Sequence, residues 1–383
     1  MLRKRRLLSI AHSYVVTVNR RLVNEMARLG GDSWEVTAVA PSFFAAGNDL
    51  RSTHFKALPG EASTVAPVDA YLTSKIHFFV YHPELRSILN RGWDVVHCWE
   101  EPYILAGGQV ALWTKRGTPL VYRSAQSLDK RYPPPFNLIE RYAMGKAAGW
   151  ICSGETVEAN LKQRAGYANL PMRRIPLGVD LANFHPDRAA GYATRRRLGW
   201  EEAGPPVVGY LGRFSQEKGL TLLMNALDGV ATPWRALFVG AGVLEPVLRE
   251  WAKRHGDRVR ICADVTHDDV PPYVNAMDML CAPSQTMPNW REQFGRMLVE
   301  AFAAGVPVIG SDSGEIPLVV GGVGVVVGEK DTAGWQRAIQ DLLESPKKRA
   351  ELSAKGIAAA NEKYAWPVVA GSYLEFFDSL ADL

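Results

Sequence analysis

The chain has 383 residues, of which 47% are hydrophobic and 22% are charged, and its formal net charge is +4 at pH 7. This length suits two domains better than one core, and the composition is typical of a soluble globular protein. No apolar stretch reaches the roughly 18–20 residues that a membrane-spanning helix needs.

The positive charge is concentrated in the first half of the chain. Residues 1–180 hold 23 Lys and Arg against 15 Asp and Glu, a net charge of +8, whereas residues 181–383 hold 21 against 25, a net charge of −4. A basic half indicates an anionic neighbour, such as a membrane surface, a nucleic acid or an acidic substrate, or a solvated basic face.

The chain starts with a basic and then apolar stretch, MLRKRRLLSIAHSY. Because the apolar part is short and no small-residue cleavage site follows it, we predict a strand with a basic leader in place of a signal peptide. The four cysteines, Cys98, Cys152, Cys262 and Cys281, have no CxxC or metal-type spacing and are predicted to be buried free thiols. Both features indicate a cytoplasmic protein.

Short apolar runs alternate with amphipathic segments along most of the chain, which predicts parallel sheets covered by helices. Strands are predicted within residues 6–14, 34–41, 94–101, 118–126 and 148–155, and then within 206–214, 234–242, 257–265, 277–284, 306–312 and 322–329. Helices are predicted within residues 19–30, 136–147, 219–229, 244–256, 295–305 and 332–346. About eleven strands exceed one doubly wound sheet, so the fold class is α/β with two Rossmann-like domains.

The stretch around residues 177–186 is rich in turn residues and marks the hinge between the domains. We therefore expect an N-terminal domain over residues 1–178 and a C-terminal domain over residues 179–365. The last segment, 366–383, is predicted to be an aromatic-rich amphipathic helix that belongs to the second domain or crosses back to the first.

Ligands of parallel α/β sheets bind beyond the carboxyl ends of the strands, so the residues after each strand are the candidate site. Arg213 follows one strand of the second half, and Lys218 follows five residues later. Two cations at a strand end suit a diphosphate, although a solvated basic turn would have the same residues.

The turn FVGAG after the next strand has Gly240 and Gly242 at the spacing of a dinucleotide fingerprint. The third glycine of that fingerprint is replaced by Glu245, and the turn follows the second strand of its domain, so a dehydrogenase is not expected. A glycine turn that lets a nucleotide lie against the backbone remains the preferred interpretation.

Two glutamates flank the start of a predicted helix, Glu292 before it and Glu300 in its second turn, with Gly295 between them. The first amides of this helix, at Arg296, Met297 and Leu298, would form an anion site. A phosphate there would have a carboxylate on each side, and carboxylates accept hydrogen bonds from sugar hydroxyls. This pattern indicates a nucleotide sugar.

The second half resembles the retaining glycosyltransferases of family 4, which have the GT-B fold. EQFGRMLVE resembles their E-x7-E motif, YLGRFSQEKG their G-R…E-K-G element, RRIPLGVDLANFHP their linker, and AGVPVIGSDSGEIP their donor-site glycine turn. The resemblance implies two Rossmann-like domains facing a central cleft, and transfer of a sugar from a UDP- or GDP-sugar to a hydroxyl of a glycan, glycolipid or lipid-linked acceptor. It also implies that the leaving phosphate assists front-face attack, that no metal or cofactor is needed, and that nucleic acid is not a partner.

The resemblance implies roles for individual residues. Arg213 and Lys218 would hold the diphosphate, Glu292 would contact the transferred sugar, and Glu300 would bind the ribose. The remaining donor-binding positions are Gly212, Gly240, Gly242, Val265, Phe294, Gly295, Arg296, Met297 and Leu298.

The first half departs from the family in two places. The turn after the first strand has no glycine and carries His12, Tyr14 and Asn19, and the loop after residues 118–123 has no histidine. Tyr14, His97, Ser124 and Gln126 are therefore the candidate acceptor-side residues, with a structural role for His97 equally open.

Two alternatives remain: a nucleotide-sugar epimerase or hydrolase of the same fold, and a nucleotide-sugar-binding protein without catalysis. The basic leader also suggests peripheral contact with the cytoplasmic face of an anionic membrane.

Overall fold

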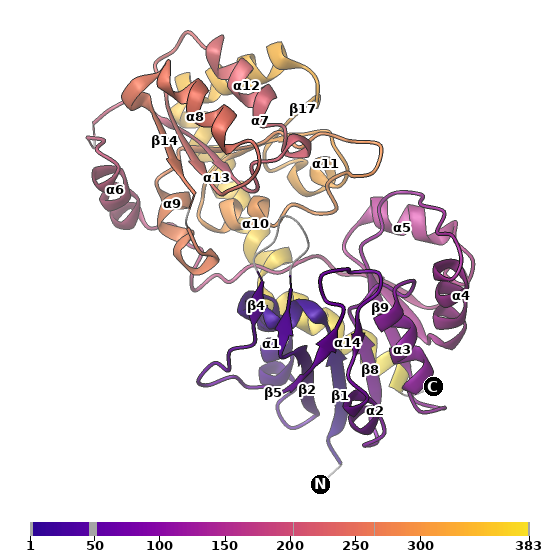
Figure 1. The fold of residues 1–383 in the computed structure, drawn as a ribbon. Coiled ribbons are helices and arrows are strands. Elements are labelled where there is room, and N and C mark those ends of the chain that lie inside the picture. The colour runs from indigo at the N-terminus through magenta and orange to yellow at the C-terminus, as the bar shows by residue number, and fades with distance from the viewer. Residues whose placement is uncertain (1–2, 46–51, 202, 264, 382–383) are drawn as a thin grey trace. The chain divides into compact units, whose positions relative to one another are not determined.

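A computed structural model describes residues 3–45, 52–201, 203–263 and 265–381 of the chain. The chain separates into two compact units: Met1–Pro176 with Trp366–Leu383 form unit 1, and Leu177–Ala365 form unit 2 (Figure 1). Within the described residues, no helix combines the length and the apolar character needed to cross a bilayer.

Unit 1 is built on a parallel seven-stranded sheet in the order β11-β10-β9-β8-β1-β2-β5. Its strands are β1 Arg5–Ile10, β2 Trp34–Pro41, β5 Thr64–Val68, β8 Val95–Cys98, β9 Leu120–Ser124, β10 Gly149–Cys152 and β11 Met172–Arg174. The sequence pattern did not predict β5, an edge strand that contains Pro67, because edge strands are only half-buried and tolerate proline.

The remaining elements of unit 1 are short. The helices are α1 Arg21–Gly30, α2 Glu84–Leu89, α3 Leu105–Trp113, α4 Phe136–Lys146 and α5 Glu155–Lys162, and 3₁₀ turns cover His12–Val15 and Thr17–Arg20. Two antiparallel pairs add β3 Phe43–Phe44 with β4 Thr53–His54, and β6 Ala70–Tyr71 with β7 Val80–Tyr81.

The last helix, α14 (Trp366–Ala381), returns to unit 1 and packs against α1. Its buried aromatic side chains, including Tyr373 and Phe377, share a core with Leu7 of β1 and Val95 of β8. This helix therefore closes one face of the first sheet, as Figure 1 shows in yellow.

Unit 2 has a parallel six-stranded sheet in the order β14-β13-β12-β15-β16-β17. Its strands are β12 Val207–Leu211, β13 Arg235–Val239, β14 Val259–Cys262, β15 Met279–Ala282, β16 Val308–Ser311 and β17 Val325–Val327. Its helices are α6 Arg188–Arg197, α7 Leu220–Asp228, α8 Glu245–Lys253, α9 Pro271–Asn275, α10 Arg296–Ala303, α11 Ile316–Val320, α12 Thr332–Glu344 and α13 Pro346–Ala359.

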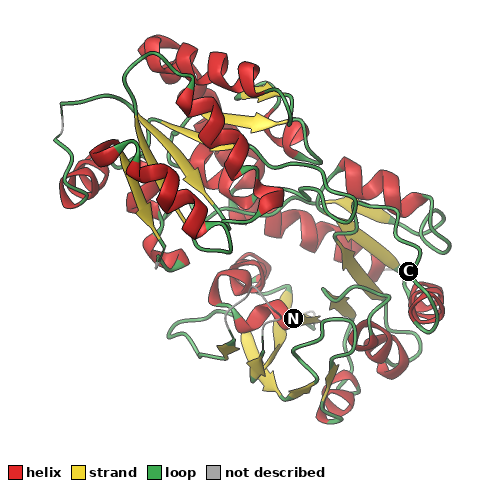
Figure 2. Ribbon diagram, turned by 45° about the horizontal axis from the view of Figure 1, so that its top comes forward, coloured by secondary structure: helices red, strands yellow, loops and turns green. Residues whose placement is uncertain are grey.

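Separate apolar cores fill the two faces of the second sheet because alternate residues of each buried strand point to opposite sides. Along β12, for example, Val207 lies in one core and Val208 in the other. Helices cover the sheet strands of both units, as Figure 2 shows in red and yellow. The predicted fold class, two doubly wound Rossmann-like domains, is confirmed.

Candidate functional site

Lys218 and Glu292 form the centre of the candidate site in unit 2. The Lys218 Nζ lies 2.5 Å from the Glu292 Oε2, and the Ser284 hydroxyl donates to the same oxygen at 3.1 Å. The ammonium also lies 4.8 Å from the centre of the Trp290 ring. Only 14% of the Lys218 side chain and 10% of the Glu292 side chain are exposed, so the pair is held in a partly dehydrated setting.

Two glycines permit the close packing behind this pair. Gly219 has φ +70°, and a Cβ there would lie 1.8 Å from the carbonyl oxygen of Pro283. Gly314 has φ +58°, and a Cβ there would lie 2.0 Å from the carbonyl oxygen of Glu292. Any other residue at either position would push away the loop that carries the site.

Arg213 lies at the end of β12 and is more exposed than Lys218. Its side chain is 44% exposed, and its guanidinium forms an ion pair of 3.2 Å with Glu217. Burial acts to raise the pKa of Glu217, but the hydrogen bond from Ser215 and the charge of Arg213 outweigh it, so the pKa is lowered. Arg213 is thus a cation at the strand end with a side chain that a ligand can reach.

The glycine turn after β13 has a structural reason. A Cβ on Gly240 would lie 1.9 Å from the carbonyl oxygen of Gly212, and one on Gly242 would lie 2.5 Å from that of Phe214. The loops after β12 and β13 therefore cross backbone to backbone. This contact alone requires both glycines, with or without a nucleotide.

The start of α10 differs in part from the anion site that the sequence predicted there. Gly295 precedes the helix with φ +84°, but the Leu298 amide donates to the Gly295 carbonyl at 2.9 Å and so is not free for a phosphate. The side chains of Phe294 and Leu298, two of the predicted donor-binding positions, are buried in the core and do not face a ligand. Met297 and Arg296 remain half-buried at the helix start.

Burial lowers the pKa of Arg296, and the charge of Glu300 opposes this shift. Glu300 itself is 4% exposed, and its carboxylate lies 2.9 Å from the Nε2 of His267. The sequence reasoning missed His267, two residues after the half-buried Val265. The position of this histidine after β14, close to the predicted donor-binding residue Val265, was the available signal.

The structure corrects two of the acceptor-side expectations in unit 1. Tyr14 and His97 are both 0% exposed and share the Ser9 hydroxyl, at 2.7 and 2.8 Å. The His97 ring packs against Tyr373 and Phe377 of α14, and burial with the nearby Arg123 charge lowers its pKa to about 3. Neither side chain can contact an acceptor, and His97 has the structural role that was left open.

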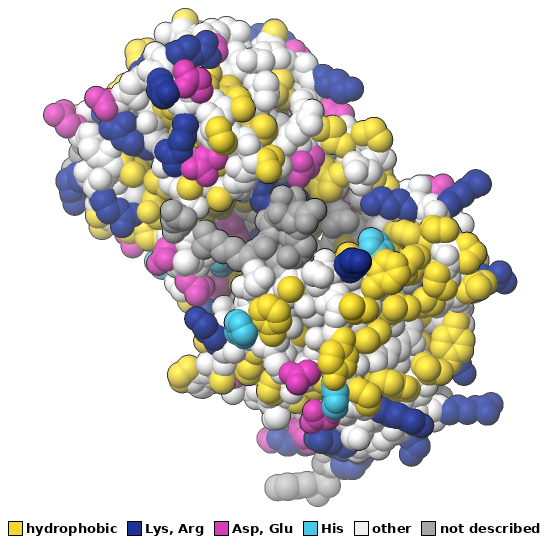
Figure 3. All heavy atoms as spheres, viewed as in Figure 1, with side chains coloured by type: hydrophobic (Ala, Val, Ile, Leu, Met, Phe, Trp, Pro, Cys, Tyr) yellow, Lys and Arg dark blue, Asp and Glu magenta, His cyan; other side chains and the backbone are white. Residues whose placement is uncertain are grey.

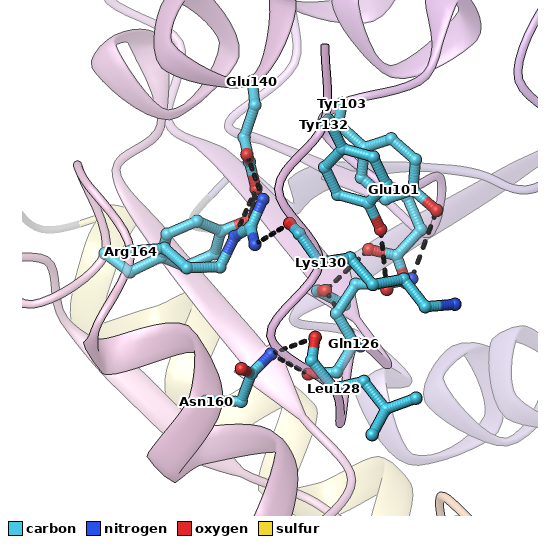
Figure 4. A network of polar contacts seen from close by, with 11 residues as sticks. Glu101, Tyr103, Gln126, Leu128, Lys130, Tyr132, Glu140, Asn160 and Arg164 are labelled. Carbon is cyan, nitrogen blue, oxygen red and sulfur yellow. Dashed lines mark hydrogen bonds and ion pairs between the residues drawn. The ribbon is translucent and has the colours of Figure 1, made fainter. Parts of the chain in front are cut away.

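Ser124 and Gln126, by contrast, belong to a polar network at the carboxyl ends of β8 and β9 (Figure 4). The Ser124 hydroxyl and the Ala125 amide donate to Glu101 at 2.6 and 2.8 Å. Burial raises the pKa of Glu101, against the effect of these hydrogen bonds. Ser124 is 1% exposed and orients the carboxylate, so only Gln126, which is half-buried, remains available to a ligand.

Gln126 is held by an aromatic pair. Its amide donates to the Tyr103 hydroxyl at 3.2 Å, and the Tyr132 hydroxyl donates to its Oε1 at 2.8 Å. The two tyrosine rings are stacked with centres 3.9 Å apart. Asn160 donates to the Gln126 carbonyl at 2.8 Å, which fixes the backbone of the loop (Figure 4).

A second charged cluster lies after β1 and was missed. The His12 Nδ1 lies 2.5 Å from the Glu100 Oε2, and the Tyr81 hydroxyl donates to Glu100 at 2.7 Å. Burial acts to lower the pKa of His12, but the Glu100 charge outweighs it and the pKa is raised. The His12 side chain is 30% exposed, so it presents a polar ring at the sheet edge. The Glu100–Glu101 pair directly after a buried strand was the signal for this cluster.

No group of three His, Cys, Asp or Glu that could hold a metal ion occurs among the described residues.

Two Rossmann-like units with cations and carboxylates at their strand ends are the arrangement that the sequence led us to expect of a GT-B glycosyltransferase. Residues 205–345 match the family model described as Glycosyl transferases group 1, and residues 15–183 match the model described as Glycosyltransferase Family 4. The chain belongs to family 4 of the glycosyltransferases and has the GT-B fold.

Similar proteins include the lipopolysaccharide core biosynthesis mannosyltransferase LpsB of Rhizobium meliloti, 26% identical over 91% of this chain and 99% of that protein. The 2-deoxystreptamine glucosyltransferase of Streptomyces kanamyceticus is 28% identical over 59% of each chain. A GDP-mannose-dependent monoacylated alpha-(1-6)-phosphatidylinositol monomannoside mannosyltransferase of Corynebacterium glutamicum is 31% identical over 51% of this chain and 53% of that protein. The match thus spans little more than half of the latter two relatives.

Among solved structures, Anabaena Alr3699/HepE in complex with UDP and glucose superposes with a TM-score of 0.76 at 19% identity, over 98% of this chain and all of that one. Sucrose-phosphate synthase of Thermosynechococcus elongatus has a TM-score of 0.73 at 20% identity, over 98% and 99% of the chains. These likenesses establish the shared fold.

Proposed function

We propose that this glycosyltransferase retains the anomeric configuration of the sugar that it transfers from a UDP- or GDP-sugar to an acceptor hydroxyl. The Lys218–Glu292 pair carries the proposal, together with the accessible Arg213, whose partner Glu217 directly precedes Lys218. A cation for the leaving diphosphate and a carboxylate for the sugar are the two groups that donor cleavage needs. Two similar proteins support a UDP- or GDP-sugar as the donor. One relative is named as GDP-mannose-dependent, and one solved structure is a complex with UDP and glucose.

In the proposed reaction, the bond between the sugar C1 and the diphosphate oxygen breaks as the acceptor oxygen attacks from the same face. The acceptor proton passes to the departing phosphate, so no protein nucleophile is needed. Lys218 and Arg213 stabilise the charge that develops on the diphosphate. Glu300, held by His267, accepts hydrogen bonds from the ribose hydroxyls, and Glu292 accepts them from the sugar.

The test is release of UDP or GDP from a panel of nucleotide sugars, with and without added glycan and lipid acceptors, in the presence and absence of EDTA. We expect transfer to survive chelation, because the diphosphate charge is neutralised by Arg213 and Lys218. Loss of transfer with EDTA that Mg²⁺ or Mn²⁺ restores would contradict the metal-independent mechanism.

The same assay separates the alternatives. A nucleotide-sugar epimerase or hydrolase would change the donor without any acceptor. A non-catalytic nucleotide-sugar-binding protein would bind the nucleotide and leave the donor intact.

We also propose a glycan, glycolipid or lipid-linked acceptor, and a location in the cytoplasm, at the inner face of the membrane if the acceptor carries lipid. Two relatives act in the synthesis of lipopolysaccharide and of phosphatidylinositol mannosides, according to their names. Both products carry lipid, and this supports an acceptor at a membrane surface.

A further inference from the structure

One face of unit 1 exposes large hydrophobic side chains. They come from the end of β6, from the loop between β6 and β7, and from α4, and include Leu72, Leu138 and Tyr71, which are 62%, 57% and 51% exposed. The full set, here called the docking face, consists of Tyr71, Leu72, Ile76, Phe78, Leu138 and Tyr142. Figure 3 shows hydrophobic side chains gathered over the part of unit 1 where Figure 1 draws α3 and α4, with Lys and Arg around them.

Ring contacts join the two segments of the docking face. Phe78 packs edge-on against Phe136 at the start of α4, with ring centres 5.3 Å apart. His77 lies 5.7 Å from Tyr103, which stacks on Tyr132 of the segment before α4. The β6–β7 loop and α4 therefore form one continuous surface, larger than scattered exposed residues would give.

The charges on this surface are almost all positive. Residues 71–78 and 129–146, all of which the structure describes, expose the cations Lys75, Lys130, Arg131, Arg141 and Lys146. The acids of these segments are Asp129, which is exposed, and Glu140, which is buried and paired with Arg164 at 2.5 Å. The Lys146 Nζ lies 5.9 Å from the centre of the Tyr142 ring, so this cation and this aromatic side chain lie on the same face of α4.

The basic leader, which the sequence suggested as the membrane contact, has its charges offset within the fold. Lys4 lies 3.3 Å from Asp32, and Arg6 lies 3.6 Å from Glu35. Arg3 pairs with Asp94, and Arg5 pairs with Asp378 of α14. These cations face acids of their own unit, so the leader attracts an anionic surface less than its composition indicates.

We infer that the docking face binds a lipid bilayer with anionic headgroups. This inference rests on the proposed function, which includes a lipid-linked acceptor. Aliphatic and aromatic side chains enter the headgroup region while Lys and Arg extend to the phosphates. A second copy of the chain is disfavoured, because a two-fold contact would bring the same exposed cations face to face. Tyr132, in the segment before α4, holds Gln126, so an acceptor anchored in the bilayer at the docking face arrives near Gln126.

The experiment is co-sedimentation of the full chain with vesicles of phosphatidylcholine, with or without phosphatidylglycerol, at low and high salt. We expect the wild type to pellet with phosphatidylglycerol vesicles at low salt. Replacing Leu72 and Phe78 with serine should weaken binding at least tenfold, since two large side chains lose their burial in the bilayer. Replacing Lys130 and Arg131 with glutamine should weaken binding to anionic vesicles at low salt.

Two controls make the test specific. Val247 on α8 of unit 2 is 50% exposed, and Val247→Ser should bind vesicles as the wild type does. Arg3→Gln with Lys4→Gln should lose little binding. Because sedimentation needs neither donor nor acceptor, it is independent of the proposed reaction. The inference is overturned if the wild type never pellets, if the leader variant loses binding while the Leu72 and Phe78 variant keeps it, or if the docking-face substitutions abolish a dimer and leave vesicle binding unchanged.

Discussion

Replacing Lys218 with alanine is expected to lower the rate of glycosyl transfer by about 10²–10³ without unfolding the protein. The substitution removes the half-buried cation that we assign to the leaving diphosphate. Glu292→Gln should cost a similar factor, because it keeps the shape of the side chain and removes the charge that Lys218 contacts at 2.5 Å. The measurement is steady-state transfer, with circular dichroism to verify folding.

Lys253→Ala is a suitable control, because it removes one positive charge of unit 2 outside the candidate site. Lys253 forms an ion pair on the surface of α8, and its side chain is 73% exposed. This variant should retain wild-type turnover. Wild-type turnover in Lys218→Ala or Glu292→Gln would show that the pair is structural and that the site has been assigned wrongly.

Gly219→Ala is expected to destabilise unit 2 by about 2–5 kcal/mol, the sum of a left-handed backbone penalty and of overpacking. The residue has φ +70°, and its new Cβ would lie 1.8 Å from the Pro283 carbonyl oxygen. Gly256→Ala is the matched control, since Gly256 has φ +55° but nothing within 4 Å of the added atom. Only the backbone penalty of about 1–2 kcal/mol should remain there.

Urea denaturation of both variants measures this difference. Because Gly219 follows Lys218 directly, Gly219→Ala should also reduce transfer in the fraction that stays folded. Equal losses of stability in the two variants would contradict the close backbone contact at Pro283.

Much of unit 2 could be predicted from the sequence because its site residues lie in strand–turn–helix units with strong local signals. Arg213 and Lys218 follow a buried strand, and Glu292 precedes a helix that starts after a glycine. The contact between Lys218 and Glu292 could not be predicted in detail, since it joins loops 74 residues apart. Nor could the sequence distinguish glycines that admit a nucleotide from glycines that let two loops cross, as at Gly240.

Unit 1 was less predictable because its core depends on distant segments. His97 follows a pattern that fits a strand end, but α14 covers it with aromatic rings from the last residues of the chain. Whether that helix joined the first or the second unit was open from the sequence. The leader shows the same limit, because the acids that offset Arg3 and Arg5 lie in other elements.

Titration of UDP and GDP into the wild type and into the Arg213→Ala and Lys218→Ala variants tests the central claim most directly, by calorimetry in the presence of EDTA. We predict that one nucleoside diphosphate binds the wild type, that each substitution weakens its binding about tenfold or more, and that Lys253→Ala leaves it unchanged. Absence of binding by both nucleotides, or binding that is indifferent to Arg213 and Lys218, would contradict a nucleotide-sugar site at these residues.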